Sequence, residues 1–223
     1  MNGGLPECIL FDLDGTLLDS LPGIEFSVRK AFSSCKLPLL EGSLRRLIGP
    51  PIRTILSQAG NVVEESRLDM LEQAFRASYD NEGWRKTVCF PEANHVLRKM
   101  HELGHRLFVV SNKPRHISLQ ILEREGILNL FEAIVTRDSR SPAYLGKEEM
   151  IKTLLSERVI AVEKCLMVGD TMEDANAAAT TRIRFIWMTH GYGAVQMSSI
   201  PVAYMLQSFS QFLPLLAEEP SSD

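Results

Sequence analysis

Short, continuous apolar runs alternate with helical patterns along most of this chain. A run of this kind, bounded by turn residues, is typical of a fully buried strand. Such runs occupy residues 8–11, 106–111, 164–169 and 185–189, with a weaker one at 132–136. Residues 92–103, 115–125 and 147–155 instead carry apolar residues three and four positions apart, which is typical of amphipathic helices. The alternation predicts an α/β fold with a parallel sheet covered by helices on both faces.

Residues 20–88 follow a different pattern. They contain no convincing strand but three helix candidates, one opened by Ser20 with Pro22, one by Pro50 and Pro51, and one at 64–79. We therefore predict a second, all-helical domain at 20–88, inserted into a core built from residues 1–19 and 89–223. Its two hinges would lie near Asp19 and near 88–91.

Polar residues follow three of the predicted buried strands. Parallel strands present their carboxyl ends at one edge of the sheet, where open α/β sheets bind ligands. These residues are Asp12 and Asp14 after the first run, Ser111, Asn112 and Lys113 after the second, and Asp170 and Asp174 after the run at 164–169. Each instance alone is common, but three at one edge predict a functional site.

The residue types at this edge match what hydrolysis of a phosphate ester needs. A covalent route requires a carboxylate nucleophile, and Mg²⁺ prefers carboxylate oxygens and can separate that carboxylate from an anionic substrate. A second carboxyl group can protonate the leaving group and then activate water. A hydroxyl and a lysine can hold the phosphoryl oxygens. Taken singly, three of these residues could have purely structural roles: Asp14 as part of a turn, Asp174 as a first-turn helix residue, and Lys147 as a solvated lysine.

Four motifs resemble those of the haloacid dehalogenase superfamily. DxDGT is present as residues 12–16, the second-strand serine as Ser111, and GDxxxD as residues 169–174. Lys147 is the best match to the motif lysine, although Glu148 stands where many relatives carry proline. The resemblance covers nearly the whole chain in the right order. It implies a doubly wound, Rossmann-like parallel sheet with an inserted all-helical cap domain, and Mg²⁺-dependent phosphatase chemistry.

Carried over to this sequence, the resemblance implies a role for each motif residue. Asp12 attacks phosphorus and binds Mg²⁺, and Asp14 is the general acid/base whose backbone carbonyl also ligates the metal. Asp170 and Asp174 complete the metal site. The phosphoryl group is bound by Ser111, Asn112, Lys147 and the backbone at Gly15. Dehalogenating members lack a carboxylate at the position of Asp14, so its presence favours phosphate chemistry.

Shorter similarities point to the phosphoglycolate phosphatase branch. These are Ser111-Asn112-Lys113-Pro114 for its second motif, Ile48-Gly49-Pro50-Pro51 for its cap loop, and Gly191-Tyr192-Gly193 after the last strand. Lys113 and Arg45 are candidates for the non-phosphate end of a substrate, with a solvated helix charge as the equal alternative for Arg45. The expected substrate is a small phosphorylated metabolite, with phosphoglycolate as the first candidate. A sugar phosphomutase or other phosphotransferase, a pyrophosphatase, a 5′-nucleotidase and a non-catalytic binding protein are the alternatives.

Two residues depart from the branch. Arg182 stands where relatives usually carry glycine after the fourth-motif helix, and a left-handed backbone there would cost about 1 kcal/mol. His190 replaces a common tryptophan. These departures bear on the substrate more than on the chemistry.

Composition and charge indicate which kinds of binding partner to expect. The chain has 223 residues, a net charge of −4 and four widely spaced cysteines without metal-ligand spacing, so we expect no nucleic-acid partner and reduced thiols. Residues 1–7 lack the pattern of a signal peptide, and no apolar run approaches the roughly 20 residues of a membrane span. We expect a cytoplasmic monomer or weak dimer with no membrane partner.

Overall fold

The computed structural model describes residues 5–42, 44–193 and 201–217. Within them, six strands form one sheet in the order β5-β4-β1-β6-β7-β8, and every neighbouring pair is parallel. The strands are β1 (Cys8–Phe11), β4 (Arg106–Ser111), β5 (Phe131–Thr136), β6 (Cys165–Gly169), β7 (Arg184–Met188) and β8 (Tyr204–Leu206). The parallel order confirms the predicted α/β fold.

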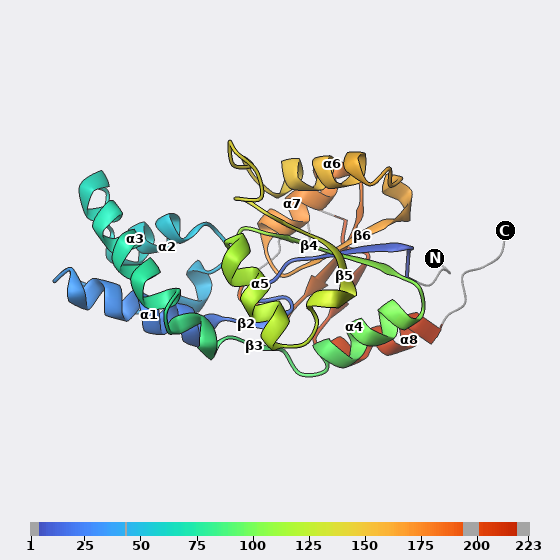
Figure 1. Cartoon of the computed structure of the whole chain (residues 1–223), viewed down its shortest axis with the longest axis horizontal. Helices are drawn as coiled ribbons and strands as arrows, with labels where there is room; N and C mark the ends of the chain where they lie inside the picture. The colour runs from blue at the N-terminus through green and yellow to red at the C-terminus, as the bar shows by residue number, and fades with distance from the viewer. Residues whose placement is uncertain (1–4, 43, 194–200, 218–223) are drawn as a thin grey trace.

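Helices cover both faces of this sheet (Figure 1). One layer consists of α6 (Lys147–Glu157) and α7 (Met172–Thr181), and the other of α4 (Ala93–Glu102), α5 (Arg115–Arg124) and α8 (Phe212–Ala217). Because side chains alternate along a strand, Cys8 and Leu10 of β1 pack toward α6 and α7. Ile9 and Phe11 belong to the cluster on the opposite face. Both faces are buried, which explains why the strand runs are apolar throughout.

The sheet matches the sequence prediction closely. All five predicted runs become strands, with ends that agree within one residue. The edge strand β8 and the short helix α8 were not predicted, because neither carries a long enough apolar pattern.

The helical insertion (residues 20–88) contains α1 (Leu21–Ser34), α2 (Ile52–Gly60) and α3 (Glu65–Tyr79), together with the 3₁₀ turns η1 (Leu44–Leu47) and η2 (Gly83–Lys86). It lies at the left of Figure 1, at the end opposite both chain termini. Its two connections, β2 (Leu18–Asp19) and β3 (Val88–Cys89), pair antiparallel.

The apolar side chains of the helical insertion are continuous with those of the core. Phe32 and Phe75 of the insertion belong to the same buried cluster as Ile9 and Phe11 of β1. The two parts therefore share one hydrophobic cluster. Their division into a core (1–19 and 89–223) and a cap (20–88) is a proposal about function.

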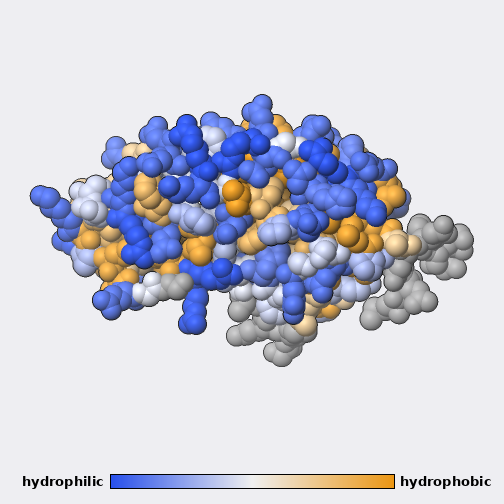
Figure 2. Space-filling model, turned by 90° about the horizontal axis from the view of Figure 1, so that it is seen from below, coloured by the Kyte–Doolittle hydropathy of each residue, from blue (hydrophilic) through white to orange (hydrophobic). Residues whose placement is uncertain are grey.

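On the face shown in Figure 2, hydrophobic residues form small patches among hydrophilic ones. Among the helices of the described ranges, none is long and apolar enough to cross a membrane.

Candidate active site

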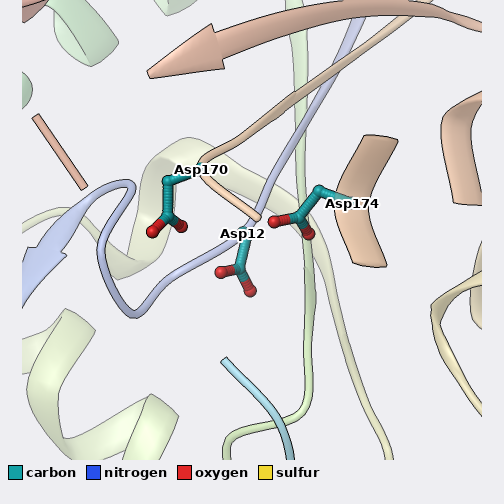
Figure 3. A group of neighbouring side chains, drawn as sticks. All are labelled: Asp12, Asp170 and Asp174. Carbon is teal, nitrogen blue, oxygen red and sulfur yellow. The ribbon is translucent and has the colours of Figure 1, made fainter. Parts of the chain in front are cut away.

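Three carboxylates meet at the carboxyl ends of the two central strands. Asp12 follows β1, Asp170 follows β6, and Asp174 lies in the first turn of α7. One oxygen from each lies within 4.8 Å of the others, and all three residues are buried. Figure 3 shows the side chains next to one another. The predicted edge of the sheet therefore does bring these acids together.

Asp174 is fixed by the start of its own helix. Thr171 is the N-cap of α7, and its hydroxyl and backbone N–H donate to Asp174 Oδ2 at 2.6 and 3.0 Å. The Asp174 N–H donates in return to the Thr171 hydroxyl. This capping box satisfies backbone donors of the first turn, so the helix-start interpretation of Asp174 is correct and coexists with its place in the site.

Asp170 is held by donors from two loops that are distant in sequence. The Thr16 hydroxyl donates to its Oδ1 at 3.0 Å, and the Tyr192 N–H donates to its Oδ2 at 2.7 Å. A Cβ added to Gly15 would lie 2.3 Å from Asp170 Oδ2, and Gly15 has φ +88°. Gly15 therefore allows the first loop to approach Asp170. Its own N–H donates to the Leu18 carbonyl.

Lys147 joins two of the acids. Its Nζ lies 2.8 Å from Asp12 Oδ1 and 2.6 Å from Asp174 Oδ1, and the residue is only 2% exposed. Burial opposes the charge, but the two carboxylates outweigh it and raise the pKa of Lys147. The interpretation of Lys147 as a solvated surface lysine is therefore wrong.

The charges of this cluster do not balance. Burial raises the pKa of Asp12 to about 8, with Lys147 acting in the opposite direction, and burial together with Asp174 raises the pKa of Asp170 to about 6. Lys147 contacts Asp12 and Asp174, and among the described residues no cation forms an ion pair with Asp170. A divalent cation bound by oxygen ligands would offset the remaining negative charge. The cluster therefore fits a magnesium ion.

A cavity of about 490 Å³ lies beside the cluster. Asp12, Asp14 and Ser111 line it from the core. Residues of α2 and α3, such as Ile55 and Tyr79, line it from the helical insertion. Ser111 is buried, and its Oγ accepts a hydrogen bond from the Lys113 N–H at 3.3 Å. The cavity gives a ligand access to Asp12, Asp14 and Ser111 together.

Lys113 connects the core to the helical insertion. Its Nζ donates to Asp14 Oδ1 at 2.9 Å and to the Tyr79 hydroxyl at 2.7 Å, and it lies 4.9 Å from the Tyr79 ring centroid. Lys113 is 5% exposed; burial disfavours its charge, but Asp14 outweighs burial and its pKa is raised. Although it lines the cavity, its ammonium group already has two protein partners.

Asn112 and Arg45 have protein partners as well. Asn112 Nδ2 donates to both carboxylate oxygens of Glu173 at 3.0 and 2.9 Å, while its Oδ1 is buried without a partner among the described residues. Arg45 donates to the carbonyls of His190 and Gly191, both at 2.7 Å. Arg45 does not line the cavity formed by the described residues.

Several contacting residues were missed by sequence reasoning. Thr16 and Tyr192 both lie inside recognised motifs. The motifs identified the two loops but did not predict the hydrogen bonds from these residues to Asp170. Tyr79 and Arg137 line the cavity without any sequence signal. A helical pattern shows which residues face a core but not which of them border a cavity.

A buried acid cluster with a lysine, at the carboxyl edge of a parallel sheet and beside a cavity, is compatible with an enzyme that acts on a phosphate group. A family model described as haloacid dehalogenase-like hydrolase matches residues 9–188. The chain belongs to this family, and it is an enzyme of the phosphatase type.

Individual relatives are similar over most of the chain. A phosphoglycolate phosphatase of Nitrosococcus oceani is 29% identical over 193 residues, covering 84% of this chain and 85% of the relative. The tyrosine-protein kinase PtkA of Mycobacterium tuberculosis is 33% identical and covers 86% of this chain, which spans 65% of that kinase. The crystal structure of a predicted phosphatase from Clostridium acetobutylicum is 27% identical, with a TM-score of 0.82 over 93% of this chain and 96% of that one.

Proposed function

We propose that this protein is a Mg²⁺-dependent phosphomonoesterase that acts on a small phosphorylated metabolite through an aspartyl phosphate on Asp12. The observation that carries the proposal is the position of Asp12, which contacts Lys147, lies close to two further carboxylates and borders the cavity. A nucleophile there can reach a phosphoryl group while its charge is balanced by neighbouring groups.

We assign each step to one residue. Asp12 attacks phosphorus, and the leaving alkoxide takes a proton from Asp14, which also borders the cavity. Asp14 then accepts a proton from the water that attacks the aspartyl phosphate, so one carboxyl group serves both half-reactions. Lys113 holds Asp14 in place through the 2.9 Å contact. The Ser111 hydroxyl and the Lys147 ammonium group stabilise charge on the phosphoryl oxygens.

Asp12, Asp170 and Asp174, with the backbone carbonyl of Asp14, would hold Mg²⁺. When bound, the ion supplies charge neutralisation between the nucleophile and the substrate. Lys147 remains bonded to Asp12 and Asp174.

The helical insertion is proposed to act as a cap that encloses the substrate. Its α2 and α3 form one wall of the cavity, so movement about the paired connections β2 and β3 would open or close the site. Phosphoglycolate is the first candidate substrate, because similar proteins are named phosphoglycolate phosphatases. Pyrophosphate and nucleoside monophosphates are substitutes. We propose that the protein is located in the cytoplasm and is a monomer or weak dimer.

A phosphotransferase is the second candidate. The similarity to a protein named as a tyrosine kinase favours it, as transfer from the aspartyl phosphate to a hydroxyl needs the same nucleophile. The two functions differ in the acceptor: a phosphatase releases free phosphate to water, whereas a phosphotransferase requires an acceptor for turnover.

The test is phosphate release from a panel of phosphomonoesters with Mg²⁺ or with EDTA. We expect release from at least one metabolite, dependence on Mg²⁺, and a loss of about 10³-fold or more in kcat for Asp12→Asn. Full activity of Asp12→Asn, or the absence of release from every ester, would contradict the proposal. Turnover only with an added acceptor alcohol would favour the phosphotransferase.

A further inference from the structure

The cavity is bordered by five cationic or titratable nitrogen-bearing side chains among the described residues. These are Arg53, Arg76, Lys113, His116 and Arg137. A substrate with a second negative group needs a cation that is not already neutralised, because a paired guanidinium or ammonium group must give up a partner to bind it. The partners of these five side chains therefore decide which one can bind a ligand.

Four of the five have an acidic partner. Arg53 lies 2.8 Å from Asp69 as well as against two glutamates, and Arg76 lies 3.8 Å from Glu72. Lys113 bonds Asp14 at 2.9 Å, and His116 lies 3.5 Å from Asp80.

Arg137 differs from the other four. Its guanidinium makes no hydrogen bond or ion pair with any residue in the ranges that the structure describes. The carboxylate of the adjacent residue, Asp138, accepts hydrogen bonds from the Arg115 N–H at 2.9 Å and from the Thr136 hydroxyl at 2.7 Å. Arg137 is half-buried, so its side chain is partly shielded from solvent.

The backbone places Arg137 next to the phosphate end of the cavity. It follows β5, and its N–H donates to the carbonyl of Ser111 at 3.2 Å. Ser111 and Arg137 therefore border the cavity from adjacent positions, one with a hydroxyl and the other with a free guanidinium. The helical insertion lines the cavity with apolar side chains such as Ile52, Ile55 and Phe75, and its cations there, Arg53 and Arg76, are paired with acids of α3.

We infer that Arg137 determines substrate specificity by binding a second anionic group, a carboxylate or a second phosphate, of a phosphomonoester whose phosphoryl group lies at Asp12. This inference rests on the proposed phosphatase function and assigns its substrate class. The planar guanidinium suits a carboxylate or phosphate because it can donate two parallel hydrogen bonds. It also replaces Arg45 and Lys113 in the role first expected for them, since both are engaged with protein groups.

The experiment compares two substrates that differ only in this group, phosphoglycolate and ethyl phosphate, in which a methyl group replaces the carboxylate. We expect the native enzyme with Mg²⁺ to prefer phosphoglycolate in kcat/KM. Arg137→Ala should lower kcat/KM for phosphoglycolate at least about tenfold more than for ethyl phosphate, a difference of about 1.4 kcal/mol. Arg137→Lys should recover part of the loss, because it keeps the charge but not the forked geometry.

Arg140→Ala is the matched control. Arg140 lies on the same loop, but its guanidinium pairs with Glu149 and packs on the Tyr144 ring, so both substrates should react as with the native enzyme. Equal losses for the two substrates in Arg137→Ala, or none, would overturn the role of Arg137 while leaving the phosphatase intact. Failure of the native enzyme to hydrolyse any phosphomonoester would instead remove the proposed function, and this inference with it.

Discussion

At the scale of single residues, the site combines groups that would be unstable apart. Lys147 is buried between Asp12 and Asp174, and its Nζ contacts one carboxylate oxygen of each. Removing one member of such a buried set leaves an uncompensated charge, which commonly costs 3–5 kcal/mol. The same contacts therefore affect stability and catalysis.

Lys147→Ala should show both effects. We expect kcat to fall by about 10³-fold, as for the loss of a group that stabilises transition-state charge, and the free energy of unfolding to fall by about 3 kcal/mol. Steady-state kinetics and urea unfolding measure the two changes. Lys152→Ala is the control on the same helix, since its exposed pair with Glu148 should matter little. Normal turnover in Lys147→Ala would mean that this lysine does not bind the phosphoryl group.

A second residue-scale prediction concerns the backbone. Arg182 follows α7 and has a left-handed backbone with φ 63°, the conformation considered for this position in the sequence analysis. Its side chain is exposed. Glycine adopts this conformation without strain, so Arg182→Gly should stabilise the fold by about 1 kcal/mol. Urea unfolding measures the gain. Arg182→Ala keeps the strain and should give little gain; equal stabilisation by both changes would point to the loss of charge instead.

At the scale of elements, one loop joins the acid cluster to the helical insertion. The Tyr192 N–H bonds Asp170, while the Tyr192 hydroxyl accepts hydrogen bonds from the Ser20 and Leu21 N–H groups at 2.7 and 3.0 Å and donates to Asp19 at 2.7 Å. The start of α1 is thereby fixed by a residue that follows β7.

Tyr192→Phe should loosen this connection. The change leaves buried backbone donors at the start of α1 without a partner, which costs about 1–3 kcal/mol. We expect lower stability in urea and faster hydrogen exchange at the Ser20 and Leu21 amides. Tyr204→Phe is a suitable control, because the Tyr204 hydroxyl makes no hydrogen bond within the described ranges. Unchanged exchange in Tyr192→Phe would show that the hydroxyl does not hold the start of α1.

The elements were the most predictable part of the molecule. The central strands were found because burial on both faces makes them apolar throughout, and the motif residues follow from strand ends meeting at one edge. The partners of Lys113 and Arg45 could not be predicted, since Tyr79 and the carbonyl of His190 come from segments distant in sequence. Sequence patterns place a residue on an element but not its side chain in a network.

At the scale of the whole molecule, the acid cluster links stability to pH and metal. The folded-state pKa values of Asp12 and Asp170, about 8 and about 6, lie above the ordinary value of 3.8. The metal-free folded protein therefore binds more protons than the unfolded chain in this range, and its free energy of unfolding falls as pH rises from about 4 to 8. A cation binds the deprotonated carboxylates, so its stabilisation grows over the same range.

Thermal unfolding in Mg²⁺ and in EDTA tests this linkage. We expect a Tm increase by Mg²⁺ of at least about 3 °C at pH 8, corresponding to roughly 1 kcal/mol, and almost none at pH 4.5. Asp170→Asn should abolish the increase. A Mg²⁺ effect that is the same at both pH values, or that survives in Asp170→Asn, would place the ion elsewhere.

The central claim is that phosphorus becomes bonded to Asp12 during turnover. The most direct measurement is to quench the enzyme during turnover of its best substrate with Mg²⁺, reduce the acyl phosphate with borohydride, and map the peptide that contains residue 12. We expect homoserine at position 12, present only when substrate is added and absent in Asp12→Asn. Steady phosphate release with an unmodified Asp12, or with the reduced residue at another position, would contradict it.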